Sequence, residues 1–91
     1  YNAYIACYQE YIELVNQMDT ALSYKVDIDR LEADHDRQDI IDTVQYMGSM
    51  ERKIQRELSG EYETEGYLYM IHRIQAKLNE MLKILDLYAN D

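Results

Sequence analysis

Apolar side chains recur every three or four residues over the first 22 positions of the chain, without a break. The seam consists of Tyr1, Tyr4, Tyr8, Tyr11, Val15, Met18 and Leu22. This spacing matches the turn of an α-helix, whereas a strand would alternate at every second residue. Further apolar residues flank the seam, so the stripe is wider than a two-stranded coiled coil requires. We therefore expect an amphipathic helix over about residues 2–24 that packs against two neighbours.

Two later segments show the same period. The last one places Tyr67, Ile71, Ile74, Leu78, Met81, Leu85 and Tyr88 on one stripe, which predicts a helix over about residues 64–90. The middle one places Ile40, Ile41, Val44, Met47, Ile54 and Leu58 in one phase, which predicts a helix over about residues 35–59. Gly48 lies inside this middle helix, so either a neighbouring helix approaches closely there or the helix bends.

The link between the second and third helices carries residues typical of helix ends. Gly60 can adopt the left-handed conformation that ends a helix, and Thr64 is a suitable N-cap for the helix that follows. The chain contains no proline and only three glycines. Because the strongest helix breaker is absent, long helices are expected.

The start of the middle helix can be placed at two positions. Ile28 and Leu31 are out of phase with the seam that follows, which predicts a break or turn within residues 26–39. Two carboxylate pairs in this stretch resemble capping boxes: Asp29 with Glu32, and Asp36 with Asp39. We favour the later pair, preceded by a short turn.

The length of the chain limits the number of cores. A chain of 91 residues buries only about 60 to 65% of its extended surface and cannot support two separate cores. We therefore expect a single helical domain over residues 1–91. The short polar link between the last two helices favours an antiparallel pair. The sequence predicts an all-α fold, a three-helix bundle of long antiparallel helices, completed either within one chain or by homodimerisation.

The chain is strongly acidic, with 18 Asp and Glu residues against 9 Lys and Arg residues. Seven of the acids crowd a short stretch: Asp27, Asp29, Glu32, Asp34, Asp36, Asp39 and Asp42. Such a charge distribution repels nucleic acid and anionic membranes, so we expect neither as a direct partner. The acids form either a solvated connection or a surface for a basic protein partner.

Cysteine content and hydropathy indicate the compartment. Cys7 is the one cysteine in the sequence, which excludes an internal disulfide and is typical of a reducing compartment. No stretch reaches the 18 or more apolar residues that a membrane helix needs. We therefore expect a cytoplasmic protein.

Every aromatic ring in the chain carries a hydroxyl, because there are ten tyrosines and neither phenylalanine nor tryptophan. A hydroxyl seeks a hydrogen-bond partner when its ring is buried. The N-terminal stripe of Tyr1, Tyr4, Tyr8 and Tyr11 either forms one end of the core or anchors a partner, since tyrosine is enriched at interface hot spots. If the hydroxyls contact only solvent, Tyr→Phe at positions 4, 8 and 11 would be nearly neutral.

The acids and the tyrosines together predict a small acidic protein-interaction module. It would act as an inhibitor or adaptor that occupies a basic, nucleic-acid-binding surface of a partner protein, as a mimic of nucleic acid. The predicted partner-binding residues are Tyr1, Tyr4, Tyr8, Tyr11, Asp34, Asp36 and Asp39. This hypothesis includes no catalytic residue, cofactor or metal. A homo-oligomeric structural protein is one alternative.

Carboxylate pairs spaced three residues apart support a second alternative, an enzyme. Glu10 and Glu13 form ExxE, and Asp39 and Asp42 form DxxD. The arrangement resembles the all-α nucleotide pyrophosphohydrolases of the MazG type, in which ExxE and ExxD pairs on adjacent helices hold magnesium against nucleotide phosphates. The resemblance covers about residues 10–44 and departs from the family at Asp39. It implies a magnesium-dependent nucleotide hydrolase with Glu10, Glu13, Asp39 and Asp42 as metal ligands.

The remaining reactive side chains form no complete motif. Glu32 and His35 make a single Glu-x-x-His, which is half of the motif that carboxylate-bridged metal bundles use. His72 lacks a glutamate three residues before it, so we expect both histidines to be ordinary surface residues. Cys7 borders the apolar stripe and is expected to be a small buried hydrophobe.

Overall fold

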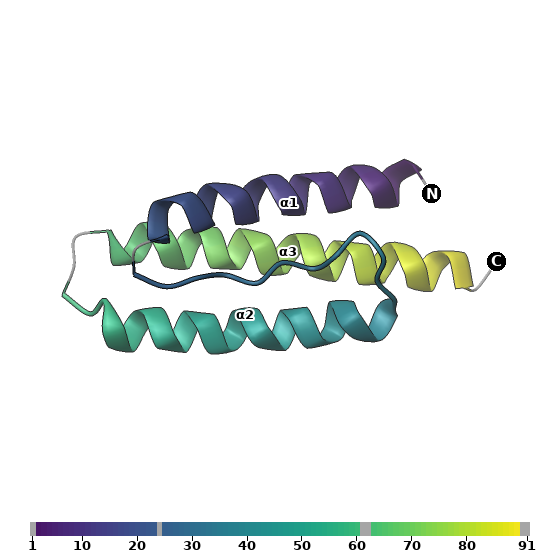
Figure 1. The fold of residues 1–91 in the computed structure, drawn as a ribbon. Helices are drawn as coiled ribbons and strands as arrows, with labels where there is room; N and C mark the ends of the chain where they lie inside the picture. The colour runs from purple at the N-terminus through teal and green to yellow at the C-terminus, as the bar shows by residue number, and fades with distance from the viewer. Residues whose placement is uncertain (1, 24, 61–62, 90–91) are drawn as a thin grey trace.

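Three α-helices make up the part of the chain that the computed structural model describes, residues 2–23, 25–60 and 63–89 (Figure 1). Helix α1 spans Asn2–Leu22, α2 spans Arg37–Glu57 and α3 spans Thr64–Ala89. Helix α3 packs against both α1 and α2. The predicted all-α three-helix bundle is therefore confirmed.

The helix directions differ between neighbours. Helix α3 runs antiparallel to both α1 and α2, so α1 and α2 run in the same direction (Figure 1). After α1 the chain must return along the whole bundle before α2 can begin. A helix of 21 residues is about 31 Å long, and the twelve residues 25–36 can cover that distance only when they are extended. We call residues 25–36 the strap.

The strap lies between α1 and α2 (Figure 1). No described Cα of α1 approaches a Cα of α2 within 8 Å. Val26, Ile28 and Leu31 of the strap are buried, whereas Asp27 and Asp29 between them are exposed. The strap thus buries its three large apolar side chains and exposes its acidic ones. Residues 26–29 follow the alternation of an extended chain, which is interrupted at Arg30.

This extended course differs from the short turn that we expected before the middle helix. The described residues 26–32 contain no helical turn, and the bends follow at residues 33 and 34. Ile28 and Leu31 are out of phase with α2 because they belong to an element with another period. The pair of Asp29 and Glu32, which resembles a capping box, caps no helix.

The helix ends follow local hydrogen bonding. Asp36 is the N-cap of α2: its carboxylate accepts from the backbone N–H of Asp39, and the Asp39 carboxylate accepts from the backbone N–H of Asp36. The later of the two predicted starts is therefore the one observed. Gly60 has a φ of 87° beyond the end of α2, as its left-handed role requires. Thr64 was expected to be the N-cap of α3, but it is the first helical residue and its hydroxyl donates to the Leu58 carbonyl.

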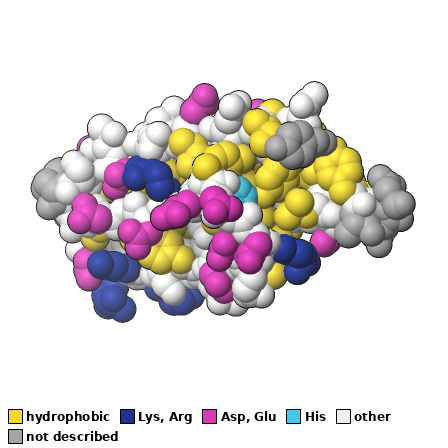
Figure 2. Space-filling view, turned by 45° about the vertical axis from the view of Figure 1, so that its right-hand side comes forward, with side chains coloured by type: hydrophobic (Ala, Val, Ile, Leu, Met, Phe, Trp, Pro, Cys, Tyr) yellow, Lys and Arg dark blue, Asp and Glu magenta, His cyan; other side chains and the backbone are white. Residues whose placement is uncertain are grey.

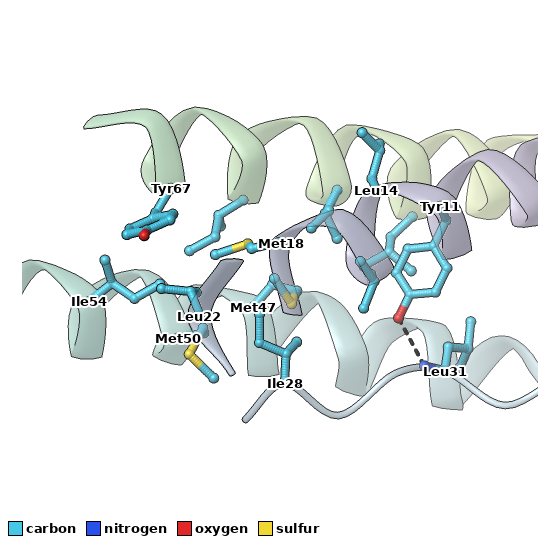
Figure 3. Packing of buried hydrophobic residues seen from close by; sticks show 14 of the residues in the cluster. Tyr11, Leu14, Met18, Leu22, Ile28, Leu31, Met47, Met50, Ile54 and Tyr67 are labelled. Atoms are coloured by element: carbon cyan, nitrogen blue, oxygen red, sulfur yellow. Dashed lines mark hydrogen bonds between the residues drawn. The ribbon is translucent and has the colours of Figure 1, made fainter. Parts of the chain in front are cut away.

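One core runs along the axis of the molecule, whose Cα atoms extend over 48 × 19 × 19 Å. It contains the buried parts of all three predicted seams together with the strap (Figure 3). The buried residues include Tyr11, Val15, Met18 and Leu22 of α1, Ile40, Met47 and Ile54 of α2, and Tyr67, Ile71, Ile74, Leu78 and Met81 of α3. At one end the seams are open, because Tyr4, Tyr8 and Leu85 are only partly buried and Tyr88 is exposed.

Gly48 offers a direct test of packing in α2. A Cβ added at this position would lie 3.9 Å from the Arg52 guanidinium and 4.0 Å from the Gln75 amide nitrogen, which are ordinary contacts. No close helix approach requires the glycine, so we expect Gly48→Ala to raise the free energy of unfolding by about 0.5 to 1 kcal/mol. Urea denaturation measures this change. A loss of stability would show that the space next to the Gly48 Cα is narrower than these distances indicate.

Candidate protein-interaction site

Tyrosine hydroxyls hold the strap in place. The backbone N–H of Leu31 donates to the Tyr11 hydroxyl at 2.8 Å (Figure 3), and the Tyr8 hydroxyl donates to the Leu31 carbonyl at 3.0 Å. From the opposite side, Tyr46 of α2 accepts from the Asp29 N–H at 3.1 Å. An extended chain without a neighbouring strand needs other partners for its backbone groups. The phenols of α1 and α2 supply them.

A carboxylate on α1 fixes the strap at a further point. One oxygen of Asp19 accepts from the backbone N–H of Ile28 at 3.2 Å, and the other accepts from the Arg30 guanidinium at 3.1 Å. Arg30 thus forms its ion pair with Asp19 and none with an acid of the strap among the described residues.

His35 completes an aromatic wall near the end of the strap. Its Nδ1 lies 2.6 Å from the Glu32 carbonyl oxygen, and a carbonyl can only accept, so Nδ1 carries the proton in the neutral ring. Nε2 is then the acceptor that faces the Tyr4 hydroxyl. The imidazole stacks on the Tyr8 ring at a centroid distance of 5.1 Å and lies 5.8 Å from the Tyr4 ring.

Burial strengthens the preference of these tyrosines for the protonated form. It is the largest cause that raises the pKa of the Tyr4, Tyr8 and Tyr11 hydroxyls above their ordinary value of 10.0. The Glu32 carboxylate raises the pKa of Tyr8 further, since it disfavours a second negative charge nearby. The three phenols are therefore neutral hydrogen-bonding groups at physiological pH.

A groove of about 740 Å³ opens where the helical seams end. Its walls come from the start of α1, the end of the strap, the first residue of α2 and the end of α3. The lining residues are Tyr4, Ile5, Tyr8, Gln9, Ala33, His35, Asp36, Arg37, Leu85, Asp86 and Tyr88. We call this the tyrosine groove. Its size and its mainly apolar and aromatic walls are typical of ligand-binding clefts.

An ion pair between α2 and α3 lines the same groove. Arg37 places Nε 3.0 Å from Asp86 Oδ1 and Nη2 3.4 Å from Asp86 Oδ2. Both side chains are 54% exposed. A pair this accessible to water contributes little to stability, about 0 to 1 kcal/mol.

The acids of the strap remain exposed along the segment that leads to this groove. Figure 2 shows acidic side chains gathered along one face, with apolar side chains at the surface next to them. Asp27, Asp29, Glu32 and Asp34 are exposed, and no ion pair with a described residue neutralises them. The face therefore combines uncompensated negative charge with an apolar groove.

The predicted partner-binding residues lie in different surroundings. Tyr1 lies outside the described residues. Tyr11 is fully buried, so it is a core residue that cannot contact a partner in this fold. Tyr4 and Tyr8 line the groove, and Asp34 is exposed on the strap. Asp36 and Asp39 are exposed, but they also form the cap of α2.

The structure does not bring together the four carboxylates of the hydrolase alternative. Glu10 and Glu13 line a groove with Arg73 and Lys77 of α3, whereas Asp39 and Asp42 line another with Arg30 and His35. Glu10 pairs with Lys77, and Asp42 accepts from Gln38 at 3.0 Å. Among the described residues, no group of three or more His, Cys, Asp or Glu side chains is placed to hold a metal ion.

The other reactive side chains lie apart from the tyrosine groove. His72 faces Glu51 across the α2 and α3 contact, with Nε2 3.1 Å from a carboxylate oxygen. Cys7 is buried, and its thiol donates to the Lys77 carbonyl at 3.3 Å. Burial, followed by the neighbouring Glu80, raises the pKa of the Cys7 thiol to about 11, which disfavours the nucleophilic thiolate.

The sequence does not reveal His35, Arg37 and Asp86 as members of one site. Arg37 and Asp86 are 49 residues apart in the chain, and no local pattern links them. His35 was expected to be an ordinary surface residue, yet it is only partly exposed between two tyrosines. The alternation of Val26, Asp27, Ile28 and Asp29 was the available signal that this stretch is extended.

Comparisons with protein-family models, with curated proteins and with solved structures find no match for this chain. Within residues 2–23, 25–60 and 63–89, no helix combines the length and apolar character that a membrane span needs. The site geometry is therefore the basis for the function proposed below.

Tyr11→Phe tests whether the phenol holds the strap. The substitution keeps the buried ring but leaves the Leu31 N–H without its acceptor, so we expect the free energy of unfolding to fall by about 1 to 3 kcal/mol. Tyr69→Phe is the matched control, because Tyr69 is 62% exposed. Equal stability of the two variants in urea denaturation would contradict the role assigned to Tyr11.

The raised pKa of the Cys7 thiol predicts how the free energy of unfolding changes at alkaline pH. Its pKa is raised in the folded state from an ordinary 9.0 to about 11, so folding favours the neutral thiol and this contribution is complete below pH 9 and lost as pH rises toward 11. Between pH 9 and 10 Cys7 alone should account for a loss of about 1 kcal/mol. Tyr4, Tyr8 and Tyr11 add to the loss in the same range, because their pKa values are also raised in the folded state. Urea denaturation at each pH should therefore show that the parent protein loses about 1 kcal/mol more than Cys7→Ala; an equal loss in both would contradict the role of Cys7.

Proposed function

We propose that this protein is an interaction module whose strap and tyrosine groove together bind a basic, partly apolar segment of a partner protein. It acts by occupying the partner's surface, as an inhibitor or adaptor, and not by turnover. Basic surfaces of this kind are the ones that bind nucleic acid, so occupying one would compete with nucleic acid for the partner.

The observation that carries the proposal is the uncompensated charge on the strap. Arg30 and Arg37, in and next to the strap, pair with acids outside it, Asp19 and Asp86. Lys25, the other cation of the strap, lies over the Tyr67 ring at its far end. The strap acids therefore outnumber the cations near them and can attract an external cation. Negative potential on one face accelerates association with a positive partner and favours it over other partners.

The groove adds the apolar part of the interface. Specific interfaces combine a desolvated centre with a polar rim, and aromatic side chains dominate the binding energy at the centre. Tyr4 and Tyr8 expose part of their rings at the groove, and Asp34 belongs to the acidic strap that leads to it. The face therefore has both components of such an interface.

Two carboxylates of the strap can be neutralised without disturbing the fold. The side chains of Asp29 and Asp34 are exposed and take part in no cap or ion pair with a described residue. Asp36 and Asp39 are unsuitable for this purpose, because removing the cap would cost α2 about 1 kcal/mol. The double variant Asp29→Asn with Asp34→Asn is the test, and Glu13→Gln with Glu57→Gln removes the same charge from exposed positions outside the strap.

A labelled amphipathic peptide of lysine and leucine serves as the defined basic probe, and fluorescence anisotropy measures its binding. We expect the strap variant to bind about fivefold more weakly, because each exposed charge pair is worth about 0.5 kcal/mol. The control variant should bind like the parent protein, and binding of the parent should weaken as salt rises from about 50 to 200 mM. Equal weakening in both variants would show that only net charge matters, and would refute the strap as the binding surface.

A further inference from the structure

The tyrosine groove contains an arginine of the protein's own chain. Arg37 presents two nitrogens to the two oxygens of Asp86, at 3.0 and 3.4 Å. This side-on arrangement is the geometry in which a carboxylate binds a guanidinium with two parallel hydrogen bonds. Asp86 is therefore already oriented to receive a guanidinium at the wall of the groove.

The pair is easily exchanged. Arg37 and Asp86 are each 54% exposed, and accessible ion pairs of this kind contribute little to stability. An arginine from outside could replace Arg37 on Asp86 while Arg37 turns to solvent. Breaking the pair would leave most of the bundle unchanged, because neither Arg37 nor Asp86 belongs to the buried core.

The other walls suit the rest of an arginine side chain. The methylene stem of arginine packs on apolar and aromatic surfaces while its charged end stays at a polar rim. Tyr4, His35 and Tyr8 form a continuous aromatic wall, and Leu85 also lines the groove. A guanidinium also stacks on aromatic faces more readily than an ammonium does.

The charge of the groove favours a cationic guest. Its lining contains two carboxylates, Asp36 and Asp86, and one guanidinium, Arg37. These three groups leave one negative charge uncompensated at a site whose other walls are mainly apolar and aromatic. A neutral apolar guest would not compensate that charge, whereas one arginine would.

We infer that the tyrosine groove is a receptor for an arginine side chain of the partner protein, with Asp86 as its acceptor and Arg37 as an internal competitor. This inference rests on the proposed function and names the anchor residue that the partner must carry. Binding exchanges one guanidinium for another on Asp86, so the affinity of the groove is set by how readily Arg37 leaves.

The probe is a blocked Leu-Arg-Leu tripeptide, compared with the same peptide containing citrulline or lysine. Citrulline keeps the planar shape of arginine without its charge. Titration followed by amide NMR shifts of the groove residues measures each affinity. We expect the arginine peptide to bind about tenfold more tightly than the citrulline peptide, since bonds between charged groups are the stronger ones, and more tightly than the lysine peptide. Equal affinity for arginine and lysine would refute the bidentate acceptor.

Two variants act in opposite directions on this affinity. Asp86→Asn removes the acceptor and should weaken binding of the arginine peptide about tenfold, whereas Glu13→Gln, with the same charge change outside the groove, should not. Arg37→Gln removes the competitor and should tighten binding of the arginine peptide more than that of the lysine peptide. Arg56→Gln, at the other end of α2, should leave both affinities unchanged. Unchanged binding in Asp86→Asn, or tightening in Arg56→Gln equal to that in Arg37→Gln, would overturn the inference.

Failure of this inference can be separated from failure of the proposed function. One outcome is that the lysine and leucine peptide binds the strap variant more weakly than its control, while the arginine peptide binds Asp86→Asn as tightly as the parent protein. In that case the groove is not an arginine receptor, and the acidic strap remains the binding surface. If neither probe distinguishes its variants, both proposals are wrong. Circular dichroism of each variant shows whether the helices are retained, so that a lost fold is not mistaken for a lost contact.

Discussion

The hydrogen bond from the Leu31 N–H to the buried Tyr11 hydroxyl is the contact on which the arrangement of this bundle depends. The two parallel helices α1 and α2 have no direct backbone contact, and an extended segment separates them. Such a segment could not lie against two helices if its N–H and C=O groups had no partners. The hydroxyls of Tyr8, Tyr11 and Tyr46 provide these partners. A seam of leucine or phenylalanine would have no polar group to offer the strap.

The same contact explains why the acids are exposed where they are. Val26, Ile28 and Leu31 face the core, and the residues between them, Asp27, Asp29 and Arg30, are exposed. The acidic face is therefore a consequence of anchoring the strap. The groove lies at the end of the strap, where the seams of α1 and α3 are only partly covered by other residues. Charge and apolar surface come to lie side by side for reasons of packing, and this combination is what a basic partner can use.

The helices could be predicted because their determinants are local. The seams that begin at Tyr4, Ile40 and Tyr67 repeat with one period, and the capping box at Asp36 lies within four residues. The strap could not be predicted in the same way, because its course is fixed by bonds that cross 20 residues of chain between Tyr11 and Leu31. The pair of Asp29 and Glu32 even imitates a helix start. The groove depends on Arg37 and Asp86 from different helices, so only the tertiary structure assembles it.

The parallel course of α1 and α2 also has a consequence for the order of folding. Helices α2 and α3 are joined by the short link of residues 58–63 and can pair through contacts that are near in sequence. Helix α1 reaches α3 only after the strap has crossed the bundle, so its contacts close a much longer loop. We expect the α2–α3 hairpin to form first and to present an apolar trough. The strap and α1 then enter it together, because the tyrosines of α1 reach their hydrogen-bond partners only when the strap is beside them.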